Sequence, residues 1–560
     1  MSDNGDQELV EIFVDDQSVK VPPGINAIEA AKFAGKEIPH YCYHPKLSVV
    51  GNCRMCLMEM GTPMRDRETG TPIMEEDGSQ KIGWIPKPVI GCSTTISPGM
   101  HIKTESNLVK DCQEGVMEFL LVNHPLDCPI CDQAGECSLQ EFAMDYGRGY
   151  SRYTERKNVK PKRTRLGPRV TLDDERCILC SRCIRFGQEI AEEDVLGFIE
   201  RGSFSTLACH PNHELDHNYS LNTVDICPVG ALTSTDFRFK MRVWFLKETP
   251  SICTESSVGT NPLVWSREGK IHRIPPRRND AVNDTWMTDS GREYYKRVEA
   301  ESRLNQFQIN GNTADAGAAI QEAARLLDSG RSAIVASGQQ SVEEQYLTKK
   351  IADHLNAPVY MARHWEKGDG LLLSEDRMPN TRGALLTQLT TKLPQETLSE
   401  LGEKMNSGEI DTLLVVGENL IDLGISNEQI NKANVLFLGT QSNSTSEEAN
   451  VLLPGLTVFE KNGSFVNLNF ILQKFQQAVP GPAGLIPDIM LLGKLLHRLT
   501  GNETPTNINS VWEELSSKYP EFTGISFANI PTEGQELDGA NYTQLDFPET
   551  KSLKFNPVNS

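Results

Sequence analysis

All 14 cysteines of this 560-residue chain lie in its first half, between Cys42 and Cys253. Dense cysteines form disulfide frameworks in short secreted chains, but in a long chain without a secretion signal they indicate metal sites. The opening sequence, MSDNGDQELVEIFVDD, is acidic and polar and has neither a signal-peptide nor a transit-peptide pattern. We therefore expect the first half to fold around metal or iron–sulfur sites.

The net charge of the chain limits its partners. Lys and Arg number 55 against 76 Asp and Glu, which gives a formal charge of −21 and a pI of about 5.1. Nucleic acid and anionic lipid are also negative, so general binding to either is not expected. No apolar run approaches the ~20 residues of a membrane span. We expect a cytosolic chain that reaches a membrane only through a partner.

The first group of cysteines has the spacing C-x10-C-x2-C-x35-C. Its members are Cys42, Cys53, Cys56 and Cys92. Plant-type ferredoxins hold a 2Fe–2S cluster in a related way, with three cysteines in one loop and a fourth further along the chain. Gly51 would let the backbone wrap closely around an inorganic core. Four cysteines are also a structural zinc set, although the first gap suits zinc ribbons poorly.

The second group lies in the stretch NHPLDCPICDQAGEC, residues 123–137. It offers His124, Cys128, Cys131 and Cys137 in the pattern H-x3-C-x2-C-x5-C. One histidine and three cysteines are an ordinary zinc set, and the spacing alone leaves zinc and an iron–sulfur cluster equally open. A lone histidine after a helix also commonly hydrogen-bonds to the backbone.

The third group is Cys177, Cys180 and Cys183, followed at a distance by Cys227 and Pro228. A C-x2-C-x2-C run with a remote Cys-Pro is typical of bacterial ferredoxins, whose clusters are 4Fe–4S. One tight turn can then present three thiolates to three irons. Three such groups in succession favour a series of electron-transfer clusters over three structural zinc sites. The cysteines left over are Cys112, expected in the core, Cys209, to which we assign no role, and Cys253.

A basic segment precedes the third group. Between residues 148 and 169, nine Lys and Arg side chains accompany a single acid, Glu155. Such runs are usually solvated loops. Near a negatively charged cluster they would also raise its reduction potential, so neutralising Arg163 and Arg165 together should lower a cluster potential.

The remaining patterns predict secondary structure. Residues 9–21 read as a β-hairpin, and residues 26–35 as a helix with Asn26 as N-cap. Residues 107–122 carry a helical apolar face of Leu108, Cys112, Val116, Phe119 and Leu120. From about residue 314, helical patterns alternate with the apolar runs SAIVASG, DTLLVVGENL and ANVLFLGTQ, which predicts an α/β domain with a parallel sheet. The last sixty residues read as partly irregular.

Four sequence stretches, taken in order, resemble one known family. They are HYCYHPKLSVVGNCRMCLMEM, NHPLDCPICDQAGECSLQ, RCILCSRCIRFGQEIA and DICPVGAL. Together they resemble the large iron–sulfur subunit, of the 75-kDa type, of respiratory NADH:quinone oxidoreductase (complex I). The resemblance spans residues 8–300 and continues more loosely to about residue 500 through EKNGSFVN and GPAGLIPD.

The resemblance implies a fold class of α+β iron–sulfur domains followed by a trimmed, degenerate α/β molybdopterin-oxidoreductase-like domain. It assigns 2Fe–2S to the first group in a β-grasp ferredoxin-like domain, and 4Fe–4S to the second group, with His124 as a ligand. A second 4Fe–4S cluster falls to the third group in a 4Fe–4S ferredoxin-like domain. The expected domains are residues 1–106, 107–147, 148–245, 246–302 (without a cluster), 303–505 (without molybdenum) and a C-terminal extension, 506–560.

The sequence departs from the family at one site. Some relatives carry one more 4Fe–4S cluster on C-x2-C-x3-C plus a later cysteine, where this chain has Cys253, Ser256, Thr260 and Thr288. One thiolate cannot hold a cluster, so we expect that site to be empty. No ligand set for molybdenum follows Cys253, and we expect no molybdopterin.

The resemblance implies an electron-relay subunit of a proton-pumping NADH dehydrogenase at the cytoplasmic face of the bacterial inner membrane. Its partners would be a flavin-bearing NADH-oxidising subunit, a ferredoxin-like 4Fe–4S subunit and the quinone-module subunits. No G-x-G-x-x-G or P-loop is present, so we expect no nucleotide binding and assign no catalytic residue. The alternatives are an accessory subunit of an NAD-linked hydrogenase or formate dehydrogenase, and a zinc-stapled scaffold.

Overall fold

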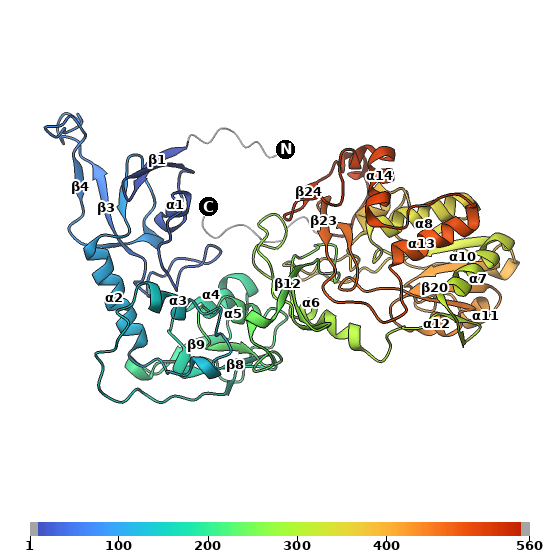
Figure 1. Ribbon diagram of the computed structural model, residues 1–560, viewed down its shortest axis with the longest axis horizontal. Coiled ribbons are helices and arrows are strands. Elements are labelled where there is room, and N and C mark those ends of the chain that lie inside the picture. The colour runs from blue at the N-terminus through green and yellow to red at the C-terminus, as the bar shows by residue number, and fades with distance from the viewer. Residues whose placement is uncertain (1–8, 550–560) are drawn as a thin grey trace. The chain divides into compact units, whose positions relative to one another are not determined.

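The computed structural model describes residues 9–549, and the chain divides into two compact units, with the division between Trp244 and Phe245 (Figure 1). The first unit contains all three predicted ligand groups, and the second contains the predicted α/β domain. No helix within residues 9–549 is long and apolar enough to cross a membrane.

The first unit begins with a mixed sheet in the strand order β2-β1-β6-β3-β4, with β5 paired to β3. The strands β1 and β6 are parallel, and helix α1 (Ala27–Phe33) packs into the same core. The predicted hairpin and helix are both confirmed, and the Asn26 side chain accepts from the Glu29 N–H at 3.0 Å. The strands are β1 (Val10–Val14), β2 (Gln17–Val21), β3 (Leu57–Pro63), β4 (Ile82–Trp84), β5 (Val89–Ile90) and β6 (His101–Lys103).

Helix α2 (Asn107–Leu121) confirms the predicted helix but turns a different face to the core. The buried residues are Val109, Gln113 and Met117, and Met117 accepts a hydrogen bond from the Tyr41 hydroxyl at 3.4 Å. Phe119 is 82% exposed, and Cys112 is only partly buried. The predicted apolar face was therefore only partly right, because Val116 and Leu120 pack against the core whereas Leu108 and Phe119 are exposed. The expectation of Cys112 as a core residue was wrong. The helix is rotated so that Met117 contacts Tyr41, a residue from a distant part of the chain.

The rest of the first unit is made of short elements around the ligand groups. A three-stranded antiparallel sheet, β11-β8-β7, and a hairpin, β10-β9, form its framework. Their bounds are β7 (Thr164–Arg165), β8 (Val170–Leu172), β9 (Leu196–Ile199), β10 (Thr206–Cys209) and β11 (Leu232–Ser234). The helices and turns are η1 (Gly91–Ser93), η2 (Cys128–Ile130), α3 (Ser138–Asp145), η3 (Asp174–Arg176), α4 (Arg182–Phe186), the π-helical turn η4 (Gly187–Ala191), η5 (Gly202–Phe204) and α5 (Asn222–Asp225).

The second unit is built on a seven-stranded sheet in the order β16-β15-β21-β20-β19-β17-β18. The five strands from β21 to β18 are parallel, as the apolar runs predicted, and β15 and β16 add an antiparallel edge. The strands are β15 (Gln308–Ile309), β16 (Asn312–Thr313), β17 (Ser332–Ala336), β18 (Val359–Met361), β19 (Thr412–Val416), β20 (Asn434–Gly439) and β21 (Val451–Pro454).

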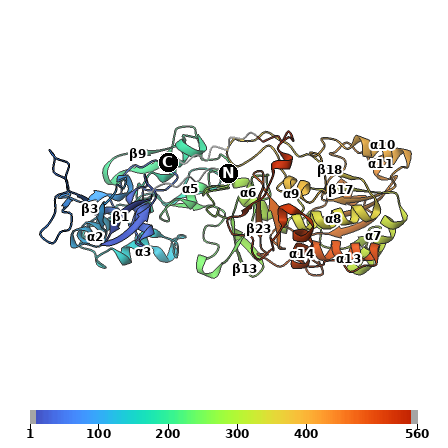
Figure 2. The same cartoon turned by 90° about the horizontal axis from the view of Figure 1, so that it is seen from above.

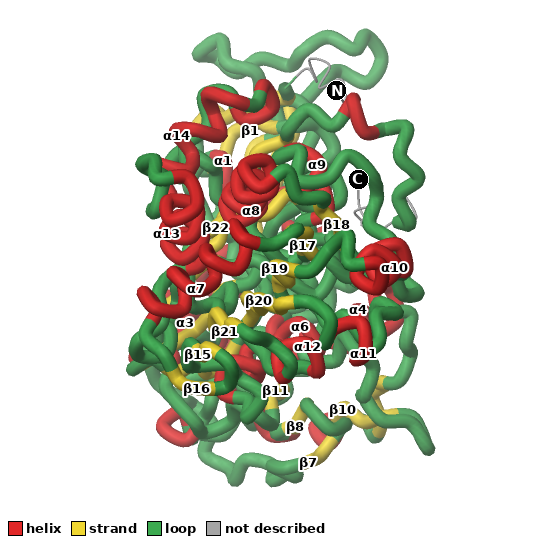
Figure 3. The backbone as a smooth tube through the Cα atoms, turned by 90° about the vertical axis from the view of Figure 1, so that its right-hand side faces the viewer, coloured by secondary structure: helices red, strands yellow, loops and turns green. Residues whose placement is uncertain are grey.

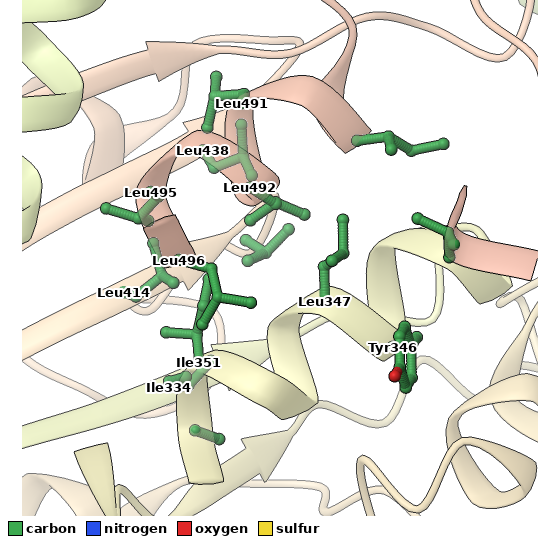
Figure 4. Close-up of a cluster of buried hydrophobic side chains, with 14 of the residues drawn as sticks. Ile334, Tyr346, Leu347, Ile351, Leu414, Leu438, Leu491, Leu492, Leu495 and Leu496 are labelled. Atoms are coloured by element: carbon green, nitrogen blue, oxygen red, sulfur yellow. The ribbon is translucent and has the colours of Figure 1, made fainter. Parts of the chain in front are cut away.

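Helices cover both faces of this sheet, so its strands read as continuous apolar runs. Figures 2 and 3 show α7, α8 and α13 on one side and α10 and α11 on the other. Leu414 faces the first layer and Leu413 the second. Figure 4 shows Leu347 and Ile351 of α8 near the leucines of α13 in the first layer. The helices are α7 (Ala316–Ser329), α8 (Val342–Leu355), α10 (Ser399–Ser407), α11 (Asn427–Ile430), α12 (Ser444–Glu447) and α13 (Asp488–Thr500).

Smaller elements complete the second unit. The helix α14 lies in the stretch whose sequence reads as partly irregular, and its Val511, Trp512 and Leu515 are buried in the same core as α8 and α13. Part of the expected C-terminal extension thus packs with the α/β layer. The six-segment division of the chain stays a prediction. The remaining helices are α6 (Asp289–Glu293), η7 (Tyr294–Glu299), α9 (Thr381–Leu386) and α14 (Ile508–Lys518). One small sheet consists of β12 (Lys247–Pro250), β13 (Leu263–Arg267) and β14 (Lys270–Arg273). Another consists of β22 (Gly463–Val466), β23 (Ile471–Phe475) and β24 (Gln535–Glu536).

Candidate iron–sulfur sites

The first ligand group is gathered by the loop between α1 and β3 and by the turn η1. Cys42, Cys56 and Cys92 are almost fully buried. The hydrogen bond from the Cys42 thiol lowers the pKa of Cys53 to about 5, and a hydrogen bond from Cys56 likewise lowers the pKa of Cys92. The four thiols thus form two contacting pairs. Gly51 adopts the left-handed φ of +63° that the tight loop requires.

The second group follows helix α2. Cys128 begins η2, Cys131 ends it, and Cys137 precedes α3. The charge of Cys128 acts on Cys137, and that of Cys137 on Cys131, so each thiol lies within electrostatic reach of another. Gly230 is needed beside them, because a Cβ there would lie 2.2 Å from the Cys131 sulfur.

His124 lies beside the same charged pair as Cys131. The charges of Asp127 and Arg176 act on both residues. Burial lowers the pKa of His124 to about 4, so its imidazole is neutral at pH 7, which is the form that binds a metal. Arg176 donates to both carboxylate oxygens of Asp127, at 3.1 and 2.7 Å, and this pair fixes the loop between His124 and Cys128.

The third group lines a partly open cavity. Its four cysteines border a space of about 20 Å³ together with Arg182 and mainly apolar side chains. Leu179 and Ser181 adopt left-handed φ values of 56° and 62°, which makes the tight turn expected of C-x2-C-x2-C. The lining cysteines are Cys177, Cys180, Cys183 and Cys227.

The chemistry of these donors suits an iron–sulfur core. Burial raises the pKa of Cys177 to about 12 and that of Cys227 to about 11, so the thiols must lose protons when they bind a metal. Within residues 9–549 no three His, Cys, Asp or Glu side chains converge on one point as the ligands of a single ion would. The third group's thiols stand around a space instead.

The basic segment is irregular, as expected, but several of its cations are paired. Arg152 donates to Glu118 on α2, and Lys157 donates to the carbonyls of Leu121 and Val122, at 2.7 and 2.8 Å, at the end of that helix. Lys162 lies 3.1 Å from Asp127. Positive charge from Lys157 and Lys162 reaches His124. Arg163 and Arg165 are exposed, and the effect of neutralising them stays a prediction.

Two functional residues were missed in the sequence. Arg182 and Arg185 bridge the ligand loops of the first and third groups. The only sequence signal for this bridging role was their position, because both are cations inside the apolar, cysteine-rich run RCILCSRCIRF.

The fourth site, where some relatives would hold a further cluster, is filled by hydrogen-bonded side chains in this chain. The Thr288 hydroxyl donates to Glu255 at 2.6 Å, and Ser256 donates to the Leu372 carbonyl at 3.3 Å. A Cβ on Gly291 would lie 2.8 Å from the Cys253 sulfur, so little space surrounds the single thiol.

We therefore expect Cys253→Ala to leave the iron and sulfide content of the purified chain unchanged. The thiol has no second cysteine with which to share a cluster. Iron analysis beside the unaltered chain checks this, and a loss of about four irons would instead place a 4Fe–4S cluster at Cys253.

The carboxyl edge of the parallel sheet is also filled. In open α/β sheets, ligands bind where the strand order reverses, which here is between β17 and β19. Glu418, after β19, pairs with His364 at 2.7 Å. Asn380 donates to the carbonyls of Gly338 and Gln340, at 3.0 and 2.8 Å, and a Cβ on Gly338 would lie 2.5 Å from Met378. The chain's own residues 364–380 occupy this edge.

Five family models match successive parts of the chain. They are a 2Fe-2S iron-sulfur cluster binding domain (residues 7–107), the NADH-ubiquinone oxidoreductase-G iron-sulfur binding region (113–152), the ferredoxin-like domain of NADH-quinone oxidoreductase subunit 3 (167–233), an NADH-ubiquinone oxidoreductase NDSU1/NuoG-like 4Fe-4S domain (246–296) and molybdopterin oxidoreductase (333–498). This order confirms the expected fold class. The chain thus contains domains of the 2Fe–2S and 4Fe–4S binding types, followed by a domain of the molybdopterin-oxidoreductase type.

Curated relatives narrow the class further. The chain is 42% identical over 305 residues to NADH dehydrogenase [ubiquinone] iron-sulfur protein 1, mitochondrial, of Solanum tuberosum, covering 54% of this chain and 38% of that protein. It is 36% identical over 365 residues to the G-type subunit of NADH-quinone oxidoreductase from Rickettsia felis, covering 64% and 51%. For the same subunit from Rickettsia bellii the identity is 40% over 320 residues, covering 57% and 43%. Over these residues the chain is similar to the G-type iron–sulfur subunit of NADH-quinone oxidoreductase.

The chain spans about half, or less, of the length of these curated relatives. Among solved structures, a chain of an NAD+-reducing [NiFe]-hydrogenase is 27% identical and covers 42% of this chain and 91% of its own length, with a TM-score of 0.32.

Proposed function

We propose that this chain is an electron-relay subunit of an NADH:quinone oxidoreductase. It would hold one 2Fe–2S cluster and two 4Fe–4S clusters and pass electrons from a flavin subunit toward quinone. The proposed ligands are Cys42, Cys53, Cys56 and Cys92 for 2Fe–2S, His124, Cys128, Cys131 and Cys137 for one 4Fe–4S cluster, and Cys177, Cys180, Cys183 and Cys227 for the other.

One observation carries the proposal. The three ligand groups fall within three successive segments that match, in the same order, iron–sulfur domain models, two of them specific to this enzyme. The cavity that four thiols border and the neutral imidazole of His124 support the same assignment.

The chain's own part is to bind the clusters and set their potentials. When bound, the clusters would supply one-electron transfer. Hydrogen bonds, charge and burial from the surrounding residues tune such sites. No acid–base pair or nucleophile is required, and we assign no catalytic residue.

The α/β domain is proposed to hold no molybdopterin. The filled carboxyl edge supports this, because Met378 and Asn380 occupy the place where an open sheet binds its ligand. No cysteine follows Cys253 in the sequence to ligate molybdenum.

The proposed partners are the flavin-bearing NADH-oxidising subunit, a ferredoxin-like 4Fe–4S subunit and the quinone-module subunits of the same complex. Attachment to the cytoplasmic face of the inner membrane would come through these partners. The names of the curated relatives support membership in such a complex.

The test is to tag the chain, purify its native complex anaerobically and add NADH. We expect the low-temperature EPR signals of reduced iron–sulfur clusters to appear with NADH and to disappear when a quinone is added. Reduction by hydrogen or formate, with EPR signals that persist when a quinone is added, would instead support an accessory subunit of an NAD-linked hydrogenase or formate dehydrogenase.

A further inference from the structure

Arg182 connects the loops of two ligand groups. Its Nη1 donates to the carbonyl of Ile226 at 3.1 Å, and its Nη2 donates to the carbonyl of Tyr43 at 2.5 Å. Ile226 precedes Cys227 of the third group, and Tyr43 follows Cys42 of the first. A single guanidinium therefore spans the peptide groups beside one ligand of each site.

Arg185 connects the same two loops. Its side chain is buried, and its Nη2 donates to the carbonyls of Cys42, at 2.5 Å, and Cys180, at 3.4 Å. Its Nη1 donates to the Ser48 carbonyl and its Nε to the Ser181 hydroxyl at 3.2 Å. Every nitrogen of this guanidinium has a protein acceptor, so the contacts of Arg185 are those of a residue that holds the two loops together.

Two further contacts hold the loops in register. Asn52, beside Cys53, donates to the carbonyl of Leu179 at 3.1 Å, and the Ser48 N–H donates to Glu189 at 2.8 Å. The loops of the first and third groups are thus joined by hydrogen bonds at several points.

Arg182 differs from Arg185 in one respect. Its Nε is buried and, within residues 9–549, has no hydrogen-bond partner. The same side chain lines the cavity that the four thiols of the third group border. A buried guanidinium N–H without an acceptor is costly, and the sulfur atoms of a negatively charged cluster in that cavity would be acceptors for it.

We propose that Arg182 is a positioning residue that serves both cluster sites. Its Nε–H donates to a sulfur of the 4Fe–4S cluster at the third group, and its two Nη groups hold the loop of the 2Fe–2S site against that cluster. This inference rests on the proposed function. Because reduction makes a cluster more negative, the adjacent cation favours the reduced state and raises the potential of the 4Fe–4S cluster most.

The test compares Arg182→Lys and Arg182→Met with the matched variants Arg185→Lys and Arg185→Met in the intact complex. Lysine keeps the charge but cannot reproduce the three-way fork of donors. Each variant is examined for iron content, for midpoint potentials by EPR-monitored redox titration and for exchangeable protons coupled to the third cluster by ENDOR. The unaltered complex should show such a proton.

We expect Arg182→Lys to retain all three clusters but to lose the exchangeable-proton coupling and shift the third cluster to lower potential. Arg185→Lys should keep the coupling, because its N–H groups bind only protein oxygens. Arg182→Met should lower the potential further, and shift the third cluster more than Arg185→Met does. If Arg182→Met fails to bind iron, the potential and the proton coupling of the third cluster in Arg182→Lys alone decide whether the inference holds.

A fully loaded Arg182→Lys complex with unchanged potential and unchanged proton coupling would overturn the inference while leaving the proposed function intact. Loss of the coupling in Arg185→Lys but not in Arg182→Lys would overturn it as well. An unaltered complex that contains no cluster at the third group would remove both the proposed function and this inference.

Discussion

Replacing Cys227 with alanine is expected to remove one 4Fe–4S cluster and with it the route for electrons. Cys227 is the remote ligand of the third group, and its thiol lines the same cavity as Cys177, Cys180 and Cys183. Three thiolates leave one iron of the cluster without a protein ligand. Iron should fall from about ten to about six atoms per chain. NADH-to-quinone turnover should fall by more than about 100-fold, because even residues behind the ligands cost up to that much.

Cys209→Ala is the matched control for this change. Cys209 is also partly buried, and its thiol donates to the Leu166 carbonyl at 3.2 Å, but it lies outside all three ligand groups. Its iron content and turnover should match those of the unaltered complex. Full iron in Cys227→Ala, or a lost cluster in Cys209→Ala, would contradict the ligand assignment.

The second large effect concerns the stability of the α/β unit. Arg303 and Glu460 form a buried ion pair at 2.8 Å, with side chains only 5% and 1% exposed. Arg303→Met leaves the Glu460 carboxylate buried, with hydrogen bonds only from Thr457 in the described contacts. Breaking such a pair from one side costs about 3–5 kcal/mol in the free energy of unfolding.

Urea unfolding measures this cost. Trp286 and Trp512 are fully buried in the second unit, so their fluorescence reports on its unfolding. Arg331→Met is the control, because Arg331 and Asp411 also lie 2.8 Å apart but are 66% and 34% exposed. An exposed pair contributes at most about 1 kcal/mol. Equal losses in the two variants would show that burial of the Arg303 pair does not matter.

The sequence predicted those features that depend on neighbouring residues. The Asn26 cap of α1 needs only the N–H three residues later. The turn at Leu179 and Ser181 follows from cysteines spaced three apart. The parallel strands β17, β19 and β20 follow from short apolar runs that must be covered on both faces.

Features that depend on distant contacts could not be predicted in this way. Periodicity placed Phe119 on the buried face of α2, but Tyr41, from a far part of the chain, packs against Met117 instead. The bridging role of Arg182 requires the carbonyls of Tyr43 and Ile226 to lie on either side of it. Neither the spacing of the cysteines nor local propensity contains that information.

The same distinction applies to the ligand assignment. Spacing alone left zinc and iron equally open for His124 and its three cysteines, and all twelve ligands remain predictions. The structure pairs thiols within the first group, places those of the second within electrostatic reach of one another, and sets the four of the third group around one cavity.

The most direct test of the electron-relay function is the metal content of the chain, purified anaerobically within its complex, together with the EPR spectrum of its reduced form. We predict about ten irons and about ten acid-labile sulfides per chain, with one 2Fe–2S and two 4Fe–4S signals. Zinc in place of iron, with no EPR signal after anaerobic reconstitution, would show that the same cysteines bind structural zinc and would contradict the electron-relay function.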